Sequence, residues 1–131
     1  MAPLRVLAVD DSPVIARLLQ IALGGIAEVT TCSKAAAARE MGTSAEWDLA
    51  IVDLSMPHIS WLELAETWRS AGASYPVVIL SGYDAPGTMP PGVSAWMTKP
   101  FSPAELRSLV ERLTGRASDS ASALPDGSTA G

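Results

Sequence analysis

The chain has 131 residues, of which 48% are apolar and 18% charged, and its formal net charge is −5. This length suits one domain, and the apolar content can fill a core on both faces of a sheet. The nine Lys and Arg residues are scattered along the chain, which argues against a nucleic-acid-binding surface, and a single cysteine, Cys32, excludes an internal disulfide.

The first predicted element is a buried strand over Leu4–Val9, a nearly continuous apolar run. Two aspartates end this run before it reaches the length of a signal-peptide core or a membrane span, so we expect a cytoplasmic location. Ser12 is then a candidate N-cap, and Pro13 suits the first turn of a helix that ends near Gly24.

Strands and helices continue to alternate along the rest of the chain. The further strands are expected at Glu28–Cys32, Leu49–Val52, Val77–Leu80 and, more weakly, Ala95–Met97. The further helices are expected from Ser33 to about Met41, from Ser60 to Gly72 and from Ser102 to about Leu113, the last two opened by capping boxes at Ser60/Glu63 and Ser102/Glu105. This alternation favours an α/β fold with a doubly wound parallel sheet and right-handed crossovers.

One segment between two predicted strands lacks the pattern of a helix. The 13 residues between Ser81 and Ala95 include three prolines and three glycines. An interior proline costs a helix about 3 kcal/mol and a glycine about 1 kcal/mol. We therefore expect a loop in place of the fourth helix.

The end of the chain has a different composition from the rest. Residues 115–131 are mostly small or polar and include no aromatic residue, so they cannot bury enough surface to offset the entropy of ordering. We predict one folded domain over residues 1–114 and a disordered tail over residues 115–131.

Side chains suited to chemistry stand at the carboxyl ends of four predicted strands. Asp10 and Asp11 follow the first strand, Asp53 the third, Ser81 the fourth and Lys99 the fifth. In an open parallel sheet these ends meet in one crevice. Three carboxylates against one lysine leave about two negative charges unbalanced, which a divalent cation would neutralise. Ligands that are all oxygen atoms favour Mg²⁺.

This combination suggests phosphate chemistry. A carboxylate such as Asp53 can attack phosphorus and form an aspartyl phosphate, while the metal and Lys99 stabilise charge on the transferring group. Ser81 can hydrogen-bond a phosphoryl oxygen. Each part alone has an ordinary structural explanation, since acidic residues are favoured near helix starts and Lys-Pro is usually a turn. Their occurrence together at four strand ends favours the functional interpretation.

From Leu4 to about Leu113 the chain resembles the receiver domains of response regulators, and most of all the single-domain chemotaxis type. The motifs that carry the resemblance are Asp10-Asp11, Asp53-Leu54-Ser55-Met56-Pro57, Ser81 and Lys99-Pro100-Phe101. The resemblance implies the flavodoxin-like strand order 2-1-3-4-5. It also implies a switch of a two-component phosphorelay that is no enzyme beyond its own phosphorylation and dephosphorylation.

The resemblance further implies roles for individual residues. Asp53 would be the phosphoacceptor, Ser81 and Lys99 would contact the phosphoryl group, and the peptide bond before Pro100 would be cis. The ligands of Mg²⁺ would be Asp10, Asp11, Asp53 and the backbone carbonyl of Ser55. The implied partners are a sensor histidine kinase or histidine phosphotransfer protein and an unknown output protein, with no direct contact to nucleic acid or membrane.

Other positions concern output and phosphoryl lifetime. Trp61 stands where the family usually has Gly, and Trp96 where it usually has Tyr or Phe. Packing of a large ring explains either tryptophan at least as well as a switching role does. Ser55 and Tyr83 are expected to set the phosphoryl lifetime, because in this family the corresponding residues flank the path of the attacking water.

Three alternative functions remain open at this point. A pseudo-receiver would keep the fold as a protein-binding module that works without phosphorylation. A metal-dependent phosphatase of the haloacid-dehalogenase type requires Asp-x-Asp after the first strand, where this chain has adjacent aspartates. A flavodoxin-like electron carrier requires a phosphate-binding loop there, and Asp-Asp-Ser-Pro would repel the phosphate of FMN.

Overall fold

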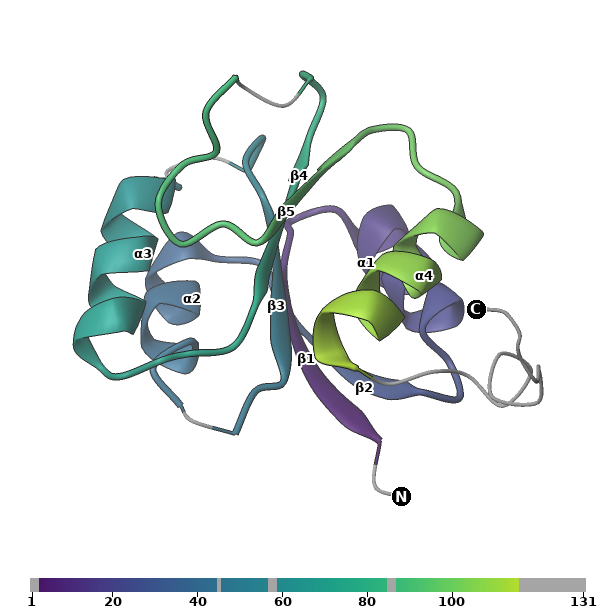
Figure 1. Ribbon diagram of the computed structural model, residues 1–131, viewed down its shortest axis with the longest axis horizontal. Helices are drawn as coiled ribbons and strands as arrows, with labels where there is room; N and C mark the ends of the chain where they lie inside the picture. The colour runs from purple at the N-terminus through teal and green to yellow at the C-terminus, as the bar shows by residue number, and fades with distance from the viewer. Residues whose placement is uncertain (1–2, 45, 57–58, 85–86, 116–131) are drawn as a thin grey trace.

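Five parallel strands form one sheet in the computed structural model, with helices on both faces (Figure 1). The structure describes residues 3–44, 46–56, 59–84 and 87–115. The strands are β1 (Leu4–Val9), β2 (Ala27–Cys32), β3 (Leu49–Asp53), β4 (Val77–Ser81) and β5 (Ala95–Thr98). The helices are α1 (Pro13–Ala22), α2 (Ala35–Met41), α3 (Trp61–Ser70) and α4 (Pro103–Thr114). The order β2-β1-β3-β4-β5 confirms the predicted fold and topology.

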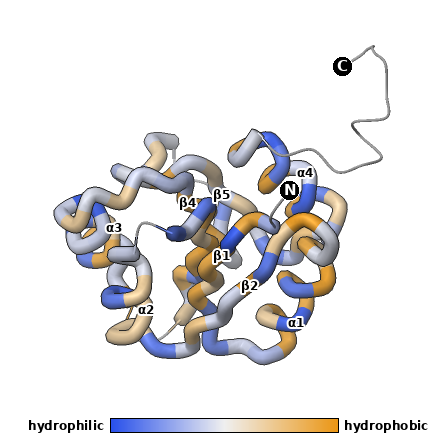
Figure 2. The backbone as a smooth tube through the Cα atoms, turned by 90° about the horizontal axis from the view of Figure 1, so that it is seen from below, coloured by the Kyte–Doolittle hydropathy of each residue, from blue (hydrophilic) through white to orange (hydrophobic). Residues whose placement is uncertain are grey.

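The core consists of two apolar layers, one on each face of the sheet. Alternate residues of β1 enter different layers: Val6 packs with α1 and α4, and Leu7 packs with α2 and α3. Helices α1 and α4 lie on one side of the sheet and α2 and α3 on the other (Figure 1). The central strands carry much of the hydrophobic colour in Figure 2, as expected of strands covered on both faces.

Several element boundaries differ slightly from the prediction. Strands β3 and β4 each extend one residue further, because Asp53 pairs with Leu80 and Ser81 pairs with Thr98 in the ladders. Two of the chemically important residues therefore end strands and are held by sheet geometry. Helix α2 begins at Ala35, two residues after the predicted start.

Only one of the two expected capping boxes is complete. In α4, Ser102 Oγ accepts from the Glu105 N–H at 3.0 Å and the Glu105 carboxylate accepts from the Ser102 N–H at 3.0 Å. In α3, Ser60 Oγ accepts from the Glu63 N–H at 3.3 Å, but the Glu63 carboxylate accepts from Arg39 Nη2 at 3.1 Å. An ion pair between α2 and α3 has taken the place of the second capping bond.

The connection from β4 to β5 contains no helix within its described residues, 82–84 and 87–94, as the prolines and glycines predict. It runs on the same side of the sheet as α3 (Figure 1). Trp61 of α3 is only 8% exposed and its Nε1–H donates to the Pro91 carbonyl at 2.9 Å. Gly92 has a φ of +81°, and a Cβ there would lie 3.4 Å from the Trp61 ring. Trp61 thus packs directly against the loop.

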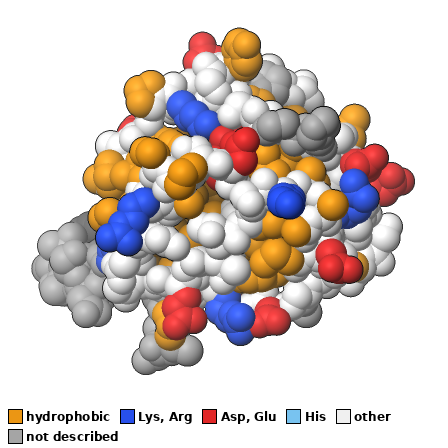
Figure 3. Space-filling model, turned by 180° about the vertical axis from the view of Figure 1, so that it is seen from behind, with side chains coloured by type: hydrophobic (Ala, Val, Ile, Leu, Met, Phe, Trp, Pro, Cys, Tyr) orange, Lys and Arg blue, Asp and Glu red, His pale blue; other side chains and the backbone are white. Residues whose placement is uncertain are grey.

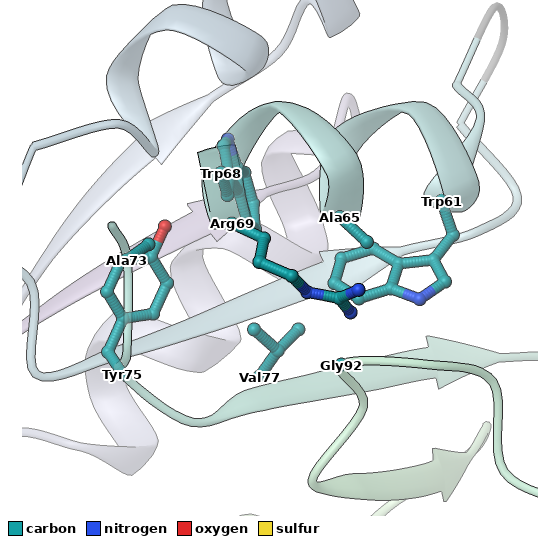
Figure 4. Close-up of a pocket in the computed structure, with 8 residues that line it drawn as sticks. All are labelled: Trp61, Ala65, Trp68, Arg69, Ala73, Tyr75, Val77 and Gly92. Atoms are coloured by element: carbon teal, nitrogen blue, oxygen red, sulfur yellow. The ribbon is translucent and has the colours of Figure 1, made fainter. Parts of the chain in front are cut away.

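A small cavity of about 60 Å³ remains beside this contact (Figure 4). The indoles of Trp61 and Trp68 meet edge to face beside it, with ring centroids 5.9 Å apart. The side chain of Arg69 extends toward the Trp61 ring above Gly92 (Figure 4). Aromatic rings from α3 therefore pack beside the loop and line the cavity.

A second tryptophan holds the start of the same connection. Nε1–H of Trp96, on β5, donates to the Tyr83 carbonyl at 2.9 Å. The loop is therefore fastened to β5 near its beginning and to α3 near its end, in each case through an indole N–H.

The surface carries mixed charge. On the side turned away in Figure 1, acidic and basic side chains are interspersed with apolar ones (Figure 3). None of the helices within the described ranges has the length and apolar character to cross a membrane.

The last helix ends at Gly115, which has the left-handed conformation with a φ of 73°. Residues 116–131 of the predicted tail lie outside the described residues. The division between domain and tail stays a prediction.

We expect the amides of Gly87, Thr88, Met89 and Gly92 to exchange with solvent faster than those of α3 in the unmodified protein, because the described part of the loop has no helical hydrogen bonds. Trp61→Phe removes the bond to Pro91 and should further increase exchange in this segment. Trp47→Phe is a matched control, because it removes an indole bond to Met41 at 2.7 Å elsewhere. Helix-like protection of residues 87–92, or equal loop exchange in both variants, would contradict this account.

Candidate functional site

The predicted acidic cluster is assembled at the carboxyl ends of β1 and β3. Carboxylate oxygens of Asp10, Asp11 and Asp53 lie within 4.8 Å of one another. The strands are adjacent and Val9 pairs with Val52, so the residues that follow stand side by side. Asp10 and Asp53 are buried, at 4% and 2% exposure, whereas Asp11 is exposed.

Three donors surround the Asp53 carboxylate. Oδ1 accepts from the Ser55 N–H at 2.9 Å and from the Ser55 hydroxyl at 2.7 Å, and Oδ2 accepts from Lys99 Nζ at 2.8 Å. Burial raises the pKa of Asp53, but the hydrogen bonds from Lys99 and Ser55 outweigh burial and leave the pKa below its ordinary value. Asp53 is therefore held as a buried, ionised carboxylate.

Asp10 has the opposite electrostatic character. Its Oδ1 accepts from the Ser12 N–H at 2.8 Å, while Oδ2 is buried and has no hydrogen-bond partner among the described residues. Burial raises its pKa to about 6, and the neighbouring Asp53 carboxylate adds to the increase, although the Ser12 bond lowers it. A buried carboxylate oxygen without a donor fits a metal ligand, because a cation would satisfy it. The residues present therefore fit a divalent ion.

Lys99 and Ser81 reach the site from the last two strands of the sheet. The Lys99 N–H donates to the Ser81 carbonyl at 2.7 Å, which ties the end of β5 to the end of β4. The peptide bond between Lys99 and Pro100 is cis, as the resemblance implied. Ser81 is buried, and its Oγ accepts from the Tyr83 N–H at 3.0 Å.

A recess of about 280 Å³ opens beside these residues. Ser55 and Ser81 both line it, and so does Tyr83, whose side chain is 83% exposed. The two hydroxyls thus share one hollow next to Asp53. The whole predicted set is therefore brought together: Asp10, Asp11, Asp53, Ser55, Ser81 and Lys99.

The structure adds one contact that the sequence analysis missed. Ser55 was expected to contribute its backbone carbonyl to the metal and to flank the path of water, but its hydroxyl also bonds the Asp53 carboxylate. The signal for this was local, because a hydroxyl two residues after an aspartate is within reach of its carboxylate.

Comparisons with known proteins agree with this geometry. A family model described as the response regulator receiver domain matches residues 6–111. The chain is 32% identical over 119 residues to the probable transcriptional regulatory protein TcrX of Mycobacterium tuberculosis, covering 84% of this chain and 51% of TcrX. It is 28% identical over 117 residues to the alkaline phosphatase synthesis transcriptional regulatory protein PhoP of Bacillus subtilis, covering 86% and 49%. The chain spans about half the length of these relatives.

Solved structures give the same result. The chemotaxis response regulator CheY4 of Vibrio cholerae aligns with a TM-score of 0.72 and 27% identity, covering 86% of this chain and 99% of CheY4. A response regulator receiver domain protein of Bacillus halodurans aligns with a TM-score of 0.73 and 27% identity, covering 85% and 97%. The match extends over nearly the whole of both structures.

Replacing Asp10 should stabilise the metal-free protein. The folded pKa of Asp10 lies above its unfolded value of 3.8, so its contribution to stability is full below about pH 4 and is lost as the pH rises through about 6. Asparagine does not ionise, so Asp10→Asn does not lose stability as the pH rises. We expect its free energy of unfolding near pH 7 to exceed that of the wild type by about 1–3 kcal/mol in urea denaturation with a chelator.

The exposed neighbour provides the control for this prediction. Asp11→Asn also removes one negative charge. The Asp11 carboxylate is exposed and therefore little desolvated in the wild type, so its replacement should stabilise the protein less than Asp10→Asn does. Added Mg²⁺ should reduce the advantage of Asp10→Asn, because the ion neutralises the wild-type cluster. An Asp10→Asn protein no more stable than the wild type at any pH from about 4 to 7 would refute this account of the cluster.

Proposed function

Because the chain belongs to the response regulator receiver domain family, we propose that it is a phosphorylation-dependent switch of a two-component phosphorelay, with Asp53 as the phosphoacceptor. The observation that carries this proposal is the buried, ionised Asp53 carboxylate beside Lys99, Ser55 and two further aspartates. A carboxylate in this setting is a nucleophile whose charge is balanced on one side by a lysine.

In the proposed reaction, an oxygen of Asp53 forms a bond to phosphorus as the bond from phosphorus to the donor breaks. The donor is a phosphohistidine of a partner protein or a small acyl phosphate. The electron pair of the broken bond stays with the histidine nitrogen or with the acyl oxygen of the donor. Lys99, 2.8 Å from Asp53 Oδ2, is within reach of the incoming group and offsets its charge. Ser81 donates to a phosphoryl oxygen from the shared recess.

Four groups would hold Mg²⁺ at this site: Asp10, Asp11, Asp53 and the backbone carbonyl of Ser55. The ion, when bound, would supply positive charge for the transferring phosphoryl oxygens. The unsatisfied Oδ2 of Asp10 and the closeness of the three carboxylates support this assignment.

The proposal extends to partners and setting. The phosphoryl group would come from a sensor histidine kinase or a histidine phosphotransfer protein, and an output protein would read the phosphorylated state. The chain would act in the cytoplasm, bind neither nucleic acid nor membrane directly, and catalyse only its own phosphorylation and dephosphorylation. The pseudo-receiver alternative gains no support from the described residues, because all of the acids, Ser81 and Lys99 are present and assembled.

Incubation with acetyl phosphate and Mg²⁺ should add one phosphate to the wild-type chain, and intact-mass measurement detects it. Asp53→Asn replaces the nucleophilic carboxylate and should abolish the adduct. Asp84→Asn, an exposed aspartate that lines the same recess, is the matched control and should be phosphorylated normally. Persistence of the adduct in Asp53→Asn would show that another residue is the phosphoacceptor.

Measurements of Mg²⁺ affinity should distinguish the role of the acids from that of the lysine. Asp11→Ala removes a proposed ligand and should weaken Mg²⁺ binding at least about tenfold in a calorimetric titration. Lys99→Ala removes a positive charge that competes with the ion, so Mg²⁺ affinity should stay equal or increase while phosphorylation is impaired. Equal Mg²⁺ affinity in the wild type and Asp11→Ala would refute the proposed site.

A further inference from the structure

The cavity between α3 and the turn that leads into β5 lies apart from the site at Asp53 (Figure 4). Its volume of about 60 Å³ equals that of about two water molecules, which is also the size of a small branched alkyl group. Most of its walls are apolar side chains of α3, of β4 and of the segment between them: Trp61, Ala65, Trp68, Ala73, Tyr75 and Val77.

The polar atoms of the three aromatic rings have partners outside this cavity. Trp61 Nε1–H donates to the Pro91 carbonyl at 2.9 Å, and Trp68 Nε1–H donates to two carbonyls of α2, each at 3.2 Å. The Tyr75 hydroxyl donates to the Gly42 carbonyl at 2.5 Å. A water molecule in the cavity would therefore find few hydrogen-bond partners on these walls, and an apolar group is the better occupant.

Arg69 places a positive charge at the edge of the apolar cavity. Its side chain is exposed and extends from the last turn of α3 back toward the Trp61 ring (Figure 4). A basic residue in a last turn commonly interacts with the terminal carbonyls of its helix. The Arg69 guanidinium, in contrast, has no hydrogen bond or ion pair with any described residue. Its N–H donors are thus available to an anion.

Gly92 leaves space beside this guanidinium. It is the third residue of a turn in which the Val93 N–H donates to the Pro90 carbonyl at 3.2 Å, and its φ of +81° fits a type II turn. A Cβ at Gly92 would lie 3.4 Å from both Arg69 Nη2 and the Trp61 ring. Because glycine has no Cβ, a small group can approach the arginine at this point.

We propose that this cavity binds a short branched-chain carboxylate, whose alkyl end fills the apolar space and whose carboxylate accepts hydrogen bonds from Arg69. A guanidinium matches a carboxylate because two parallel N–H···O bonds can form. The cavity limits the alkyl end to about three or four carbons, since a benzene ring occupies a cavity of about 150 Å³. The site is separate from Asp53 and does not depend on the proposed function.

The bound carboxylate connects α3 to the turn before β5. It is held by Arg69 of the helix and packs against Gly92 of the turn, so it stabilises the contact between these two segments by mass action. Local opening of the turn therefore becomes rarer, and amide exchange at Gly92 and Val93 becomes slower when the ligand is present.

Titration of the ¹⁵N-labelled full chain with isovalerate tests the proposal by NMR. The indole N–H signals of Trp61 and Trp68 should shift, with a dissociation constant on the order of 1 mM for a ligand of this size. The signals of Trp47 and Trp96 should stay in place, because neither residue lines the cavity. Isovaleramide lacks the charge and acetate lacks the branched end, so each should bind at least about tenfold more weakly.

Variants test the two parts of the site. Arg69→Gln removes the charge and should weaken isovalerate binding at least about tenfold, whereas Arg112→Gln, at an exposed arginine in the last turn of α4, is the matched control and should change it less than about twofold. Ala73→Val fills part of the cavity and should also weaken binding.

The same spectra show whether each variant is folded, since a folded chain gives dispersed amide signals. Equal affinity of the wild type and Arg69→Gln, or of isovalerate and isovaleramide, overturns the role of the guanidinium. Unshifted indole signals of Trp61 and Trp68 at about 50 mM isovalerate overturn the site itself.

Discussion

The crowding of three carboxylates against a single lysine is the constraint on which the rest of the structure depends. Asp10 and Asp53 are buried at neighbouring strand ends, and burial alone disfavours the charge on each. The donors are distributed unequally: Asp53 receives Lys99 and Ser55, whereas Asp10 receives one backbone N–H. One carboxylate is thereby kept ionised and the other is left without a donor on one oxygen. An arrangement that is unfavourable for an isolated fold is suited to a site that takes up a cation.

The described part of the connection from β4 to β5 contains no helix, and this side of the sheet is covered by the aromatic side chains of α3 and by the loop itself. Trp61 supplies both apolar bulk and an N–H that satisfies a carbonyl of the loop. A loop needs such donors, because it cannot satisfy its own backbone groups as a helix does. Glycine at this position would leave the loop without that support.

The sequence predicted the strands and the acids well, because both depend on local patterns. Apolar runs that end in Asp10 and Asp53 indicate buried strands and place the acids at one edge of the sheet. The capping prediction failed at Glu63 because the tertiary structure offers its carboxylate another partner, Arg39 of a neighbouring helix. The bond from the Ser55 hydroxyl to Asp53 is local, but an i, i+2 spacing makes such a bond possible without requiring it. Spacing along the chain does not determine which of two available partners a side chain takes.

Ser81 connects the site to the loop that replaces the helix, and the chemistry of its hydroxyl shows how. Ser81 Oγ accepts from the Tyr83 N–H, and the Tyr83 carbonyl accepts from the indole of Trp96. A hydroxyl has one proton to donate besides the lone pairs with which it accepts. Ser81 can therefore donate to a group in the recess while it keeps the bond from the Tyr83 N–H. The Tyr83 and Trp96 hydrogen bonds then connect Ser81, through the start of the loop, to β5.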